Sequence, residues 1–595
     1  MKNFLKMVLA VVFGLILTVV MLFMFLGGLM SSLTPSSASS SLPKSGVLAI
    51  DMSKIIIAEQ SAEPDVMTMV QGGASISTIG LWQAVSAINK AAEDPAVKYI
   101  YIKADGASGG IATLQEFRKS LANFRSCGKA VISYIESPST ASYYIASVAD
   151  KVYMTDAQGA SSMVVGIGSR LVFLKDLLDK LGVNVQLIRH GKYKSAGEMY
   201  VKNAPSPENL EQNQAMIDAV WNSYASEIAE SRNMSVEKLN SVIDNLELNK
   251  PEDFLSTGFV DALMSREELH SKLADLAVVD SYSKLKFFDL PSYIAAKLLP
   301  ASKSVNKIAV VYADGEIIDG EDKSNVAGDR FASVLAKVRA DSTVKAVVFR
   351  VNSPGGSVLA SEKIKAEVEL LMEQKPVVAS YGDYAASGGY WISNSCDKIF
   401  SNETTLTGSI GVFSMIPEFS KVMKDVVHVN MVSVSSNKHT DMYSLMRPFD
   451  DAERDYMQAS VENIYDKFVN TVADGRELES DYVDSIAQGR VWAGSDALKI
   501  GLVDEIGTLE DAINYASSLV GDPDSSSLNV VEYPKPMTSF EMLMEKLGQT
   551  SPDETVFSGT PFESVADVLN EWSRRVKKNP ADVVFARIPY AIDIQ

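Results

Sequence analysis

Short apolar runs recur along this chain without the strict alternation that a half-exposed strand would show. In the second half they read KIAVVYADGEI, VKAVVFRV, KPVVASYG and DKIFSN, and their turns carry Gly, Ser and Asn. Runs of this kind are typical of parallel strands that are buried on both faces and connected by helices. The pattern predicts an α/β fold, in which ligands bind where strands end and helices begin.

The same succession of segments occurs twice. DPAVKYIYIKADGASGG at 94–110 matches DSTVKAVVFRVNSPGGS at 341–357, an offset of 247 residues. VISYIESPSTASYYIASVADKVY and VASYGDYAASGGYWISNSCDKIF share that offset, and LSTGFVDAL and LKIGLVDEI nearly do. Self-similarity at a fixed spacing indicates a tandem duplication. We expect one copy at 46–300, a second at 301–521, and an extension at 522–595.

The most apolar stretch, residues 7–30, carries no charge and is long enough to cross a bilayer as a helix. Lys2 and Lys6 precede it, and the next basic residue is Lys44. The positive-inside rule then places residues 1–6 in the cytoplasm and the bulk of the chain outside. The Ser-rich residues 31–45 read as a flexible linker. A cleaved signal peptide is the alternative, although its apolar region is usually only ~7–15 residues long.

Composition narrows the class of protein. With 595 residues, 46% hydrophobic and 22% charged, the chain suits a globular protein of three or more lobes. A net charge of −20, spread along the chain, argues against nucleic acid as a partner. Cys127 and Cys396 are the only cysteines, and whether they pair stays open. No His, Cys or carboxylate spacing resembles a metal site, and no P-loop or dinucleotide fingerprint occurs, so we expect no cofactor.

Ser387, in YGDYAASGGYWISNS, stands between a predicted strand and a predicted helix, where we expect it to be exposed. The backbone N–H groups of Gly388, Gly355 and Gly356 are candidate donors to a developing oxyanion. Glycines that only permit tight turns are the alternative interpretation. A serine nucleophile needs a base, and the four histidines all lie far from Ser387 in sequence.

The two copies have lost different residues. At the offset of 247, Thr140 takes the place of Ser387, and an alanine and a serine replace the following glycines. Conversely, the first copy holds Lys194 in RHGKYKSAGEMY, where the second copy has Thr440. A buried lysine can act as a general base because desolvation lowers its pKa. We therefore predict that Lys194 of the first copy activates Ser387 of the second, with the Ser409 hydroxyl orienting the amine.

These segments resemble the signal peptide peptidase A family of serine–lysine peptidases, peptidase family S49. NSPGGSVLASE, AASGGYWIS, TGSIGV, GKYKSA and GRVWAGSDALKIGLVD match its pattern over roughly residues 1–520. The resemblance implies a fold shared with crotonases and the caseinolytic protease. It also implies degradation of signal peptides left in the membrane after preproteins are processed, and a bowl-shaped homotetramer that opens toward the membrane.

The resemblance implies Ser387 as nucleophile, Lys194 as general base, Ser409 as supporting hydroxyl, and the amides of Gly356 and Gly388 as oxyanion donors. After YKSA this chain has Gly-Glu-Met at 197–199, where the family often has a bulkier apolar residue and a proline. That difference concerns the shape of the loop and not the lysine.

The function that we expect is a membrane-anchored serine endopeptidase of the bacterial inner membrane, acting on apolar peptides outside the cytoplasm. A catalytically silent membrane-tethered scaffold is one alternative, and an acyl-CoA enzyme of the crotonase type is another. The retained serine and lysine argue against the first. The absence of Glu from the Gly-rich turns, and an exported location without CoA, argue against the second.

The extension contains SFEMLMEKL and FESVADVLNEWSRRVKK, which have the 3.6-residue spacing of amphipathic helices. Such helices most often pack on their own protein. A role in assembly, or in narrowing access to the site, is the functional alternative.

Overall fold

The computed structural model describes residues 42–62, 76–298, 304–521, 528–536 and 584–587. The expected membrane anchor at 7–30 and the two expected amphipathic helices of the extension lie outside these ranges. Within the described ranges, no helix combines the length and apolarity that a membrane span needs.

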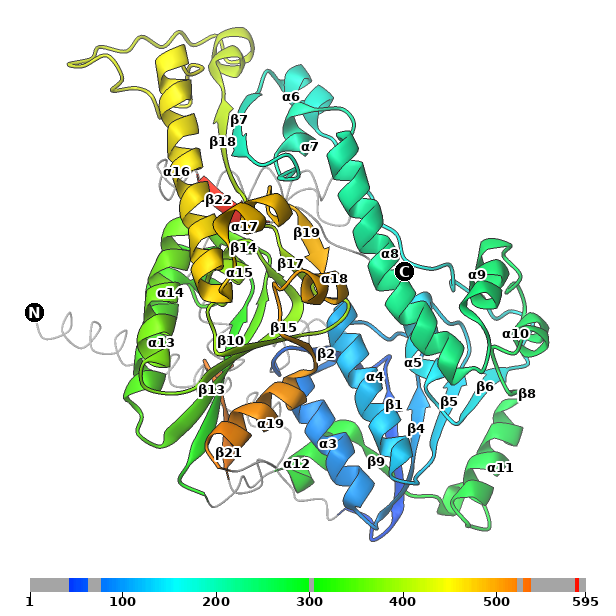
Figure 1. Ribbon diagram of the computed structural model, residues 1–595. Coiled ribbons are helices and arrows are strands. Elements are labelled where there is room, and N and C mark those ends of the chain that lie inside the picture. Colours follow the sequence, from blue (N-terminus) through cyan, green and yellow to red (C-terminus); the bar gives the residue numbers. More distant parts are fainter. Residues whose placement is uncertain (1–41, 63–75, 299–303, 522–527, 537–583, 588–595) are drawn as a thin grey trace, which may run out of the picture. The chain divides into compact units, whose positions relative to one another are not determined.

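The first copy is built on a six-stranded parallel sheet (Figure 1). In spatial order its strands are β8 (Ala262–Met264), β6 (Lys151–Thr155), β5 (Val131–Ile135), β4 (Val97–Lys103), β1 (Gly46–Asp51) and β9 (Phe287–Asp289). Its helices are α3 (Leu81–Glu93), α4 (Ile111–Ser126), α5 (Thr140–Ser147), α6 (Lys175–Leu181), α7 (Glu198–Val201), α8 (Pro207–Ser231), α9 (Val236–Asp244), α10 (Pro251–Thr257), α11 (Arg266–Leu276) and α12 (Leu290–Lys297). A small parallel pair, β2 (Ile55–Ala58) and β3 (Ser77–Gly80), stands beside it.

The second copy repeats this plan. Its main path runs β19 (Val491–Ala493), β17 (Leu406–Gly408), β15 (Val377–Ala386), β13 (Val344–Ser353), β10 (Lys307–Asp314) and β21 (Asn529–Tyr533), with β16 (Lys398–Ser401) and β20 (Glu505–Ile506) branching from β15. Its helices are α13 (Gly328–Ala340), α14 (Val358–Met372), α15 (Gly388–Trp391), α16 (Asp451–Arg476), α17 (Ser480–Ile486), α18 (Gly494–Lys499) and α19 (Leu509–Leu519). The four strands predicted for this copy are β10, β13, β15 and β16, and their parallel pairing is confirmed.

Strand β10 shows why these runs are continuously apolar. Ala309 and Val311 belong to a core that includes residues of α13 and α14, whereas Ile308 and Val310 belong to a core with α19. Because successive side chains of a strand point to opposite faces, a strand with helices on both faces needs apolar residues at every position.

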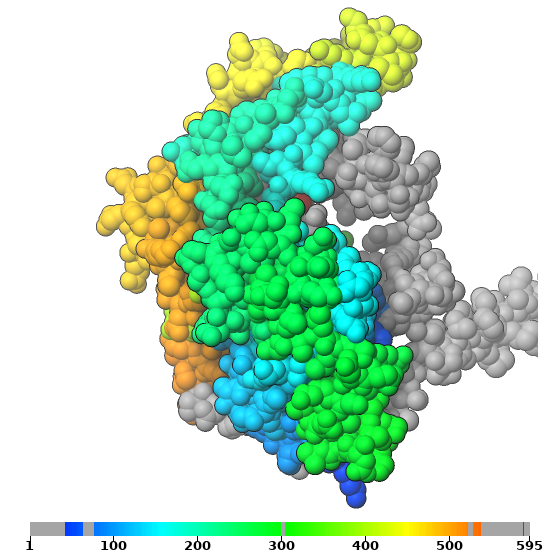
Figure 2. Space-filling model, turned by 90° about the vertical axis from the view of Figure 1, so that its right-hand side faces the viewer, coloured from blue at the N-terminus to red at the C-terminus, as the bar shows by residue number. Residues whose placement is uncertain are grey.

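A third sheet joins the copies. Its order is β12 (Val326–Ala327), β11 (Ile317–Ile318), β14 (Gly355–Ser357), β22 (Val584–Arg587), β18 (Val412–Glu418) and β7 (Asn184–His190). Strand β7 belongs to the first copy and pairs antiparallel with β18 of the second along its whole length. Helix α8 also packs on β19, and Figure 2 shows the cyan and green surface of the first copy bordering the orange surface of the second.

Candidate active site

Ser387 occupies the one residue between β15 and α15, and its backbone is strained. Its φ of 56° and ψ of −115° are unusual for a residue with a side chain, a conformation that costs of order 1–3 kcal/mol. Two backbone hydrogen bonds hold it: the Ser387 N–H donates to the Gly408 carbonyl at 2.8 Å, and the Trp391 N–H donates to the Ser387 carbonyl at 2.8 Å. The expectation that Ser387 is exposed is wrong, because the side chain is fully buried beside Lys194.

Lys194 reaches Ser387 from the first copy. Its Nζ lies 2.8 Å from the Ser387 Oγ, 3.0 Å from the Ser409 Oγ and 3.1 Å from the Ser409 carbonyl oxygen. The lysine is 1% exposed, and this burial lowers its pKa well below the usual value. A neutral amine has two N–H donors and one lone pair. If the donors point to the two Ser409 oxygens, the lone pair is left for the Ser387 hydroxyl proton.

The loop that carries Lys194 is fixed on both sides. Strand β7 leads into it, in register with β18. The Tyr193 N–H donates to the Gln488 carbonyl at 2.9 Å, and the Arg189 guanidinium donates to the Lys194 carbonyl at 2.8 Å. The Gln212 amide donates to the Tyr193 carbonyl at 2.9 Å. The lysine backbone is therefore held by groups from both copies.

Two glycines that sequence reasoning missed make room for this lysine. A Cβ on Gly489, whose φ is +77°, would lie 2.6 Å from the Lys194 Cβ and backbone N. A Cβ on Gly411 would lie 3.2 Å from the Lys194 Cδ. Gly411 belongs to TGSIGV and Gly489 begins GRVWAGSDALKIGLVD, but neither motif by itself indicates that its glycine packs against a lysine of the other copy.

Gly356 and Gly388 meet next to Ser387. Gly388 is the first residue of α15, so its N–H has no acceptor within the helix. A Cβ on Gly388 would lie 3.1 Å from the Gly356 backbone N, and a Cβ on Gly356, whose φ is +157°, would lie 1.9 Å from the Ile317 carbonyl oxygen. Close packing thus requires both glycines, and it places the Gly356 backbone N beside Gly388.

The threonine that replaces the serine in the first copy is engaged otherwise. The Thr140 hydroxyl donates to the Met163 and Gly166 carbonyls at 3.3 and 3.1 Å, and it accepts from the Val165 N–H at 3.1 Å. In the second copy, Thr440 lies in an exposed loop and donates to the Asn437 carbonyl. None of these hydrogen bonds joins either threonine to Lys194 or Ser387.

Glu198 lies in the segment after YKSA that departs from the family pattern. The side chain is buried and accepts from the Ser206 N–H at 3.0 Å, while Arg189 and Lys202 form ion pairs with it. Burial alone would raise the pKa of Glu198, but these donors outweigh it and lower the pKa to about 2. A Cβ on Gly197 would lie 2.3 Å from a Leu187 methyl, so a larger residue there requires the Leu187 side chain to move.

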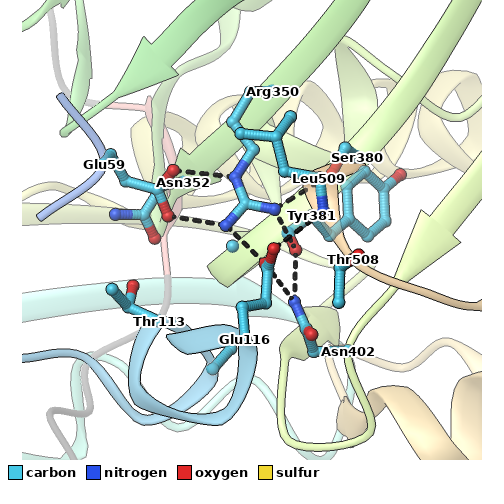
Figure 3. A network of polar contacts seen from close by, with 12 residues as sticks. Glu59, Thr113, Glu116, Arg350, Asn352, Ser380, Tyr381, Asn402, Thr508 and Leu509 are labelled. Carbon is cyan, nitrogen blue, oxygen red and sulfur yellow. Dashed lines mark hydrogen bonds and ion pairs between the residues drawn. The ribbon is translucent and has the colours of Figure 1, made fainter. Parts of the chain in front are cut away.

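A buried charge network connects the two copies (Figure 3). Arg350 of β13, which is 0% exposed, donates to both Glu59 oxygens at 2.7 and 2.9 Å and pairs with Glu116 of α4 at 2.8 Å. It also donates to the Ser380 hydroxyl and the Tyr381 carbonyl on β15, the strand that ends at Ser387. Burial raises the pKa of Glu116 and the Arg350 charge opposes that rise. Sequence reasoning missed this network.

Asp383 makes a second connection between the copies, four residues before Ser387 on β15. Its carboxylate accepts from the N–H groups of Ala112 and Thr113, at 2.7 and 3.2 Å, and so caps helix α4 of the first copy. The residue before α4, Gly110, has no side chain for this task, and a Cβ there would lie 1.7 Å from the carboxylate.

Neither a histidine nor a cysteine is among the described hydrogen-bond partners of the Lys194 amine, which are Ser387 and Ser409. His190 stacks on Tyr465 with ring centroids 3.8 Å apart. Among the described residues, His439, Asp450 and Glu453 come close enough to hold a metal ion, a grouping that the sequence spacing did not suggest. The Arg447 guanidinium already binds both Glu453 oxygens at 2.7 Å. The two cysteines are free, one exposed at 127 and one buried at 396.

Comparison with known proteins decides the family. The pattern of Peptidase family S49 matches residues 123–280 and 369–521. Protease 4 of Haemophilus influenzae is 36% identical over 477 residues, covering 78% of this chain and 77% of that protein. The chain belongs to peptidase family S49. The two S49 matches fall in the two copies, so the duplication is confirmed and the chain is an α/β serine peptidase with two S49 domains.

Other S49 relatives extend beyond bacteria. The chloroplastic serine protease SPPA of Arabidopsis thaliana is 29% identical over 469 residues, covering 78% of this chain and 69% of that protein. Among solved structures, a ClpP1 mutant from Listeria monocytogenes matches 34% of this chain and 94% of its own, with 15% identity and a TM-score of 0.24.

Proposed function

We propose that this S49 peptidase is a membrane-anchored endopeptidase that cleaves apolar peptides with a Ser387–Lys194 dyad divided between its two copies. The observation that carries the proposal is the 2.8 Å contact between the Lys194 Nζ and the Ser387 Oγ, made by a lysine that is 1% exposed. A lysine without solvent and without a carboxylate among its hydrogen-bond partners favours the neutral amine, which is the form that can accept a proton.

In the acylation step the Ser387 Oγ attacks the carbonyl carbon of the scissile peptide bond while its proton passes to the Lys194 Nζ. The amides of Gly356 and Gly388 donate to the oxygen that becomes negative, where each such donor is worth about 3 kcal/mol of barrier. As the peptide C–N bond breaks, the Lys194 ammonium gives the proton to the leaving amine. An ester between the substrate acyl group and Ser387 remains.

Deacylation reverses these proton transfers with water. Water attacks the ester carbonyl while Lys194 takes its proton, and the ester C–O bond then breaks as Ser387 recovers a proton. Both halves of the reaction need neutral Lys194 at the start. The rate is therefore expected to rise with pH until Lys194 is deprotonated, at a pH lowered by its burial.

Remnant signal peptides are the substrates that the proposal favours. The support is the resemblance of the motifs to signal peptide peptidases and the uncharged stretch at 7–30, which would hold the enzyme at the membrane where such peptides remain. We place the two S49 domains on the extracytoplasmic side of a bacterial inner membrane, in a homotetramer as the family resemblance implies. A library of apolar peptides tests the preference, and cleavage mainly after charged residues would contradict the signal-peptide role.

The dyad is tested with the full chain in detergent and a fluorogenic apolar peptide. Ser387→Ala and Lys194→Ala should each lose at least about 10⁴-fold in kcat/KM, and a serine-directed reagent should label Ser387 only when Lys194 is present. Lys192→Ala is the matched control, since Lys192 is exposed two residues away. Activity in Lys194→Ala would place the base elsewhere. A parent enzyme that neither cleaves peptides nor reacts with the reagent would favour the silent scaffold.

A further inference from the structure

The C-terminal strand β22 lies inside the third sheet, between two strands of the second copy (Figure 1). On one side it pairs antiparallel with β14, so that Arg587, Ala586 and Phe585 stand opposite residues 355, 356 and 357. On the other side it pairs antiparallel with β18, with Phe585 opposite Phe413. A four-residue segment far along the chain therefore fills the gap between these two strands.

That gap adjoins the proposed catalytic residues. Ala586 stands opposite Gly356, whose amide is a proposed oxyanion donor, and Gly356 packs against Gly388 beside Ser387. An extended peptide commonly binds by adding a strand to an exposed sheet edge, with main-chain hydrogen bonds supplying the affinity. Without β22, strands β14 and β18 would present such edges on both sides of the place where a scissile carbonyl must lie.

We propose that β22 is a built-in occupant of the peptide groove between β14 and β18, and that it must leave before a substrate strand can pair there. This inference rests on the proposed peptidase function and adds its regulation. Main-chain pairing lets one groove hold either the chain's own C-terminal strand or a substrate of different sequence. The ion pair between the Arg587 guanidinium and Glu316, at 3.4 Å, fixes the end of the strand beside β11.

While a tethered strand occupies the groove, only molecules whose groove is open can bind substrate. The apparent dissociation constant for the substrate is therefore the intrinsic constant divided by the open fraction. If β22 is paired in about nine molecules of ten, its release tightens peptide binding roughly tenfold. Once the peptide is bound, the chemical step is the same, so the effect falls on KM and leaves kcat unchanged.

The test uses two alanines of the same C-terminal segment. Ala586→Pro removes an N–H from a strand that is paired on both sides, a position that proline does not tolerate. Ala591→Pro makes the same substitution four residues beyond the end of β22 and is the matched control. A chain ending at residue 583 removes the strand altogether. Each change is made in a protein that begins at residue 1 and carries Ser387→Ala, so that no cleavage occurs.

Binding of a fluorescein-labelled Ala/Leu octapeptide, flanked by lysines, is followed by fluorescence anisotropy in the same detergent for every variant. Ala586→Pro and the chain ending at 583 should bind roughly tenfold more tightly than the parent, and Ala591→Pro should match the parent. Hydrogen exchange gives a readout that needs no peptide: loss of β22 should speed exchange of the amides of β14 and β18. Equal affinities in all four proteins, together with unchanged exchange, would overturn the proposal.

Active enzyme separates this inference from the proposed function. Ala586→Pro with a parental KM would reject the occupant while leaving the peptidase intact. Tighter peptide binding in Ala586→Pro, with no hydrolysis by any serine-containing protein, would reject the dyad and keep the occupant. Intact-mass measurement supplies the last outcome: if the active parent clips its own chain within 584–587, β22 is a substrate and not an occupant, and the proposal fails.

Discussion

Replacing Gly489 with alanine should disable the enzyme by displacing Lys194. The new Cβ would lie 2.6 Å from the Lys194 Cβ and from its backbone N, where ordinary contacts begin at 3.4 Å. A shift of about 0.8 Å must therefore be absorbed, and misplacing a catalytic group by 1 Å costs about 10²-fold in rate. The shift cannot be confined to a flexible side chain, because the crowded atoms include the lysine backbone, which the Tyr193–Gln488 hydrogen bond holds in place.

The same substitution also strains its own backbone. Gly489 has a φ of +77°, and a left-handed conformation costs an L-residue roughly 1–2 kcal/mol. Gly501→Ala is the matched control: its φ is +81°, and its nearest neighbours are Leu478 methyls at 3.8 Å. Both variants should lose a few degrees in thermal melting, whereas only Gly489→Ala should lose about 10²-fold in kcat on an apolar peptide. Equal kcat values in the two variants would refute the packing role of Gly489.

Four further predictions concern buried ionisable side chains. Lys194→Met should be inactive. Its free energy of unfolding relative to the parent should nevertheless increase as the pH falls from 10.5 toward the lowered pKa of Lys194, because in that range only the unfolded parent binds a proton at this lysine. The expected increase is about 1.4 kcal/mol for each pH unit by which the pKa is lowered, and urea unfolding at several pH values measures it. Arg350→Met should cost about 3–5 kcal/mol in urea unfolding, since it leaves two buried carboxylates without their cation. Glu198, with a pKa of about 2, stabilises the fold above pH 4.5 and loses that contribution as the pH falls toward 2, so the melting temperatures of Glu198→Gln and the parent should converge over that range. Asp383→Ala and Gly110→Ser should each lower the free energy of unfolding. The double variant should lose about 0.5–2 kcal/mol less than the sum of the two single losses, because a serine at 110 can cap α4 once the carboxylate is gone. Additive losses would reject this exchange of caps.

The strands and the proximity of Lys194 to Ser387 could be predicted because their signals lie within short segments or repeat at a fixed offset. Runs such as VKAVVFRV are apolar at nearly every position, as a strand covered on both faces requires. At an offset of 247 Thr140 replaces Ser387, and Lys194 of the first copy has no lysine counterpart in the second, so these reciprocal losses predict that the two residues share one site. The structure then places Lys194 within hydrogen-bonding distance of Ser387.

The remaining features depend on partners that no local pattern specifies. Glu59 reads as an ordinary surface acid, and its partner Arg350 is 291 residues away. Gly489 is one of 36 glycines, and only the approach of Lys194 distinguishes it. The burial of Ser387 was predicted wrongly for the same reason, because the groups that cover it come from the other copy and from strands whose pairing the sequence does not give.

Comparison of the two helices that follow the Gly-rich turns shows that the exchange between copies is not limited to the proposed base, Lys194. In the second copy Ser357 caps its own helix, α14, by accepting from the Ala360 N–H. The position of Ser357 is Gly110 in the first copy, and the second copy supplies the missing acceptor through Asp383. The first copy in turn supplies Lys194 to Ser387, which lies on the same strand end as Asp383. The missing cap and the missing lysine are thus each supplied by the other copy, and both contacts lie at the end of β15. Separating the copies would therefore remove Lys194, the proposed base, from Ser387 and would also remove the Asp383 cap from α4, so that the geometry proposed for catalysis and the stability of the interface depend on neighbouring contacts at one strand end.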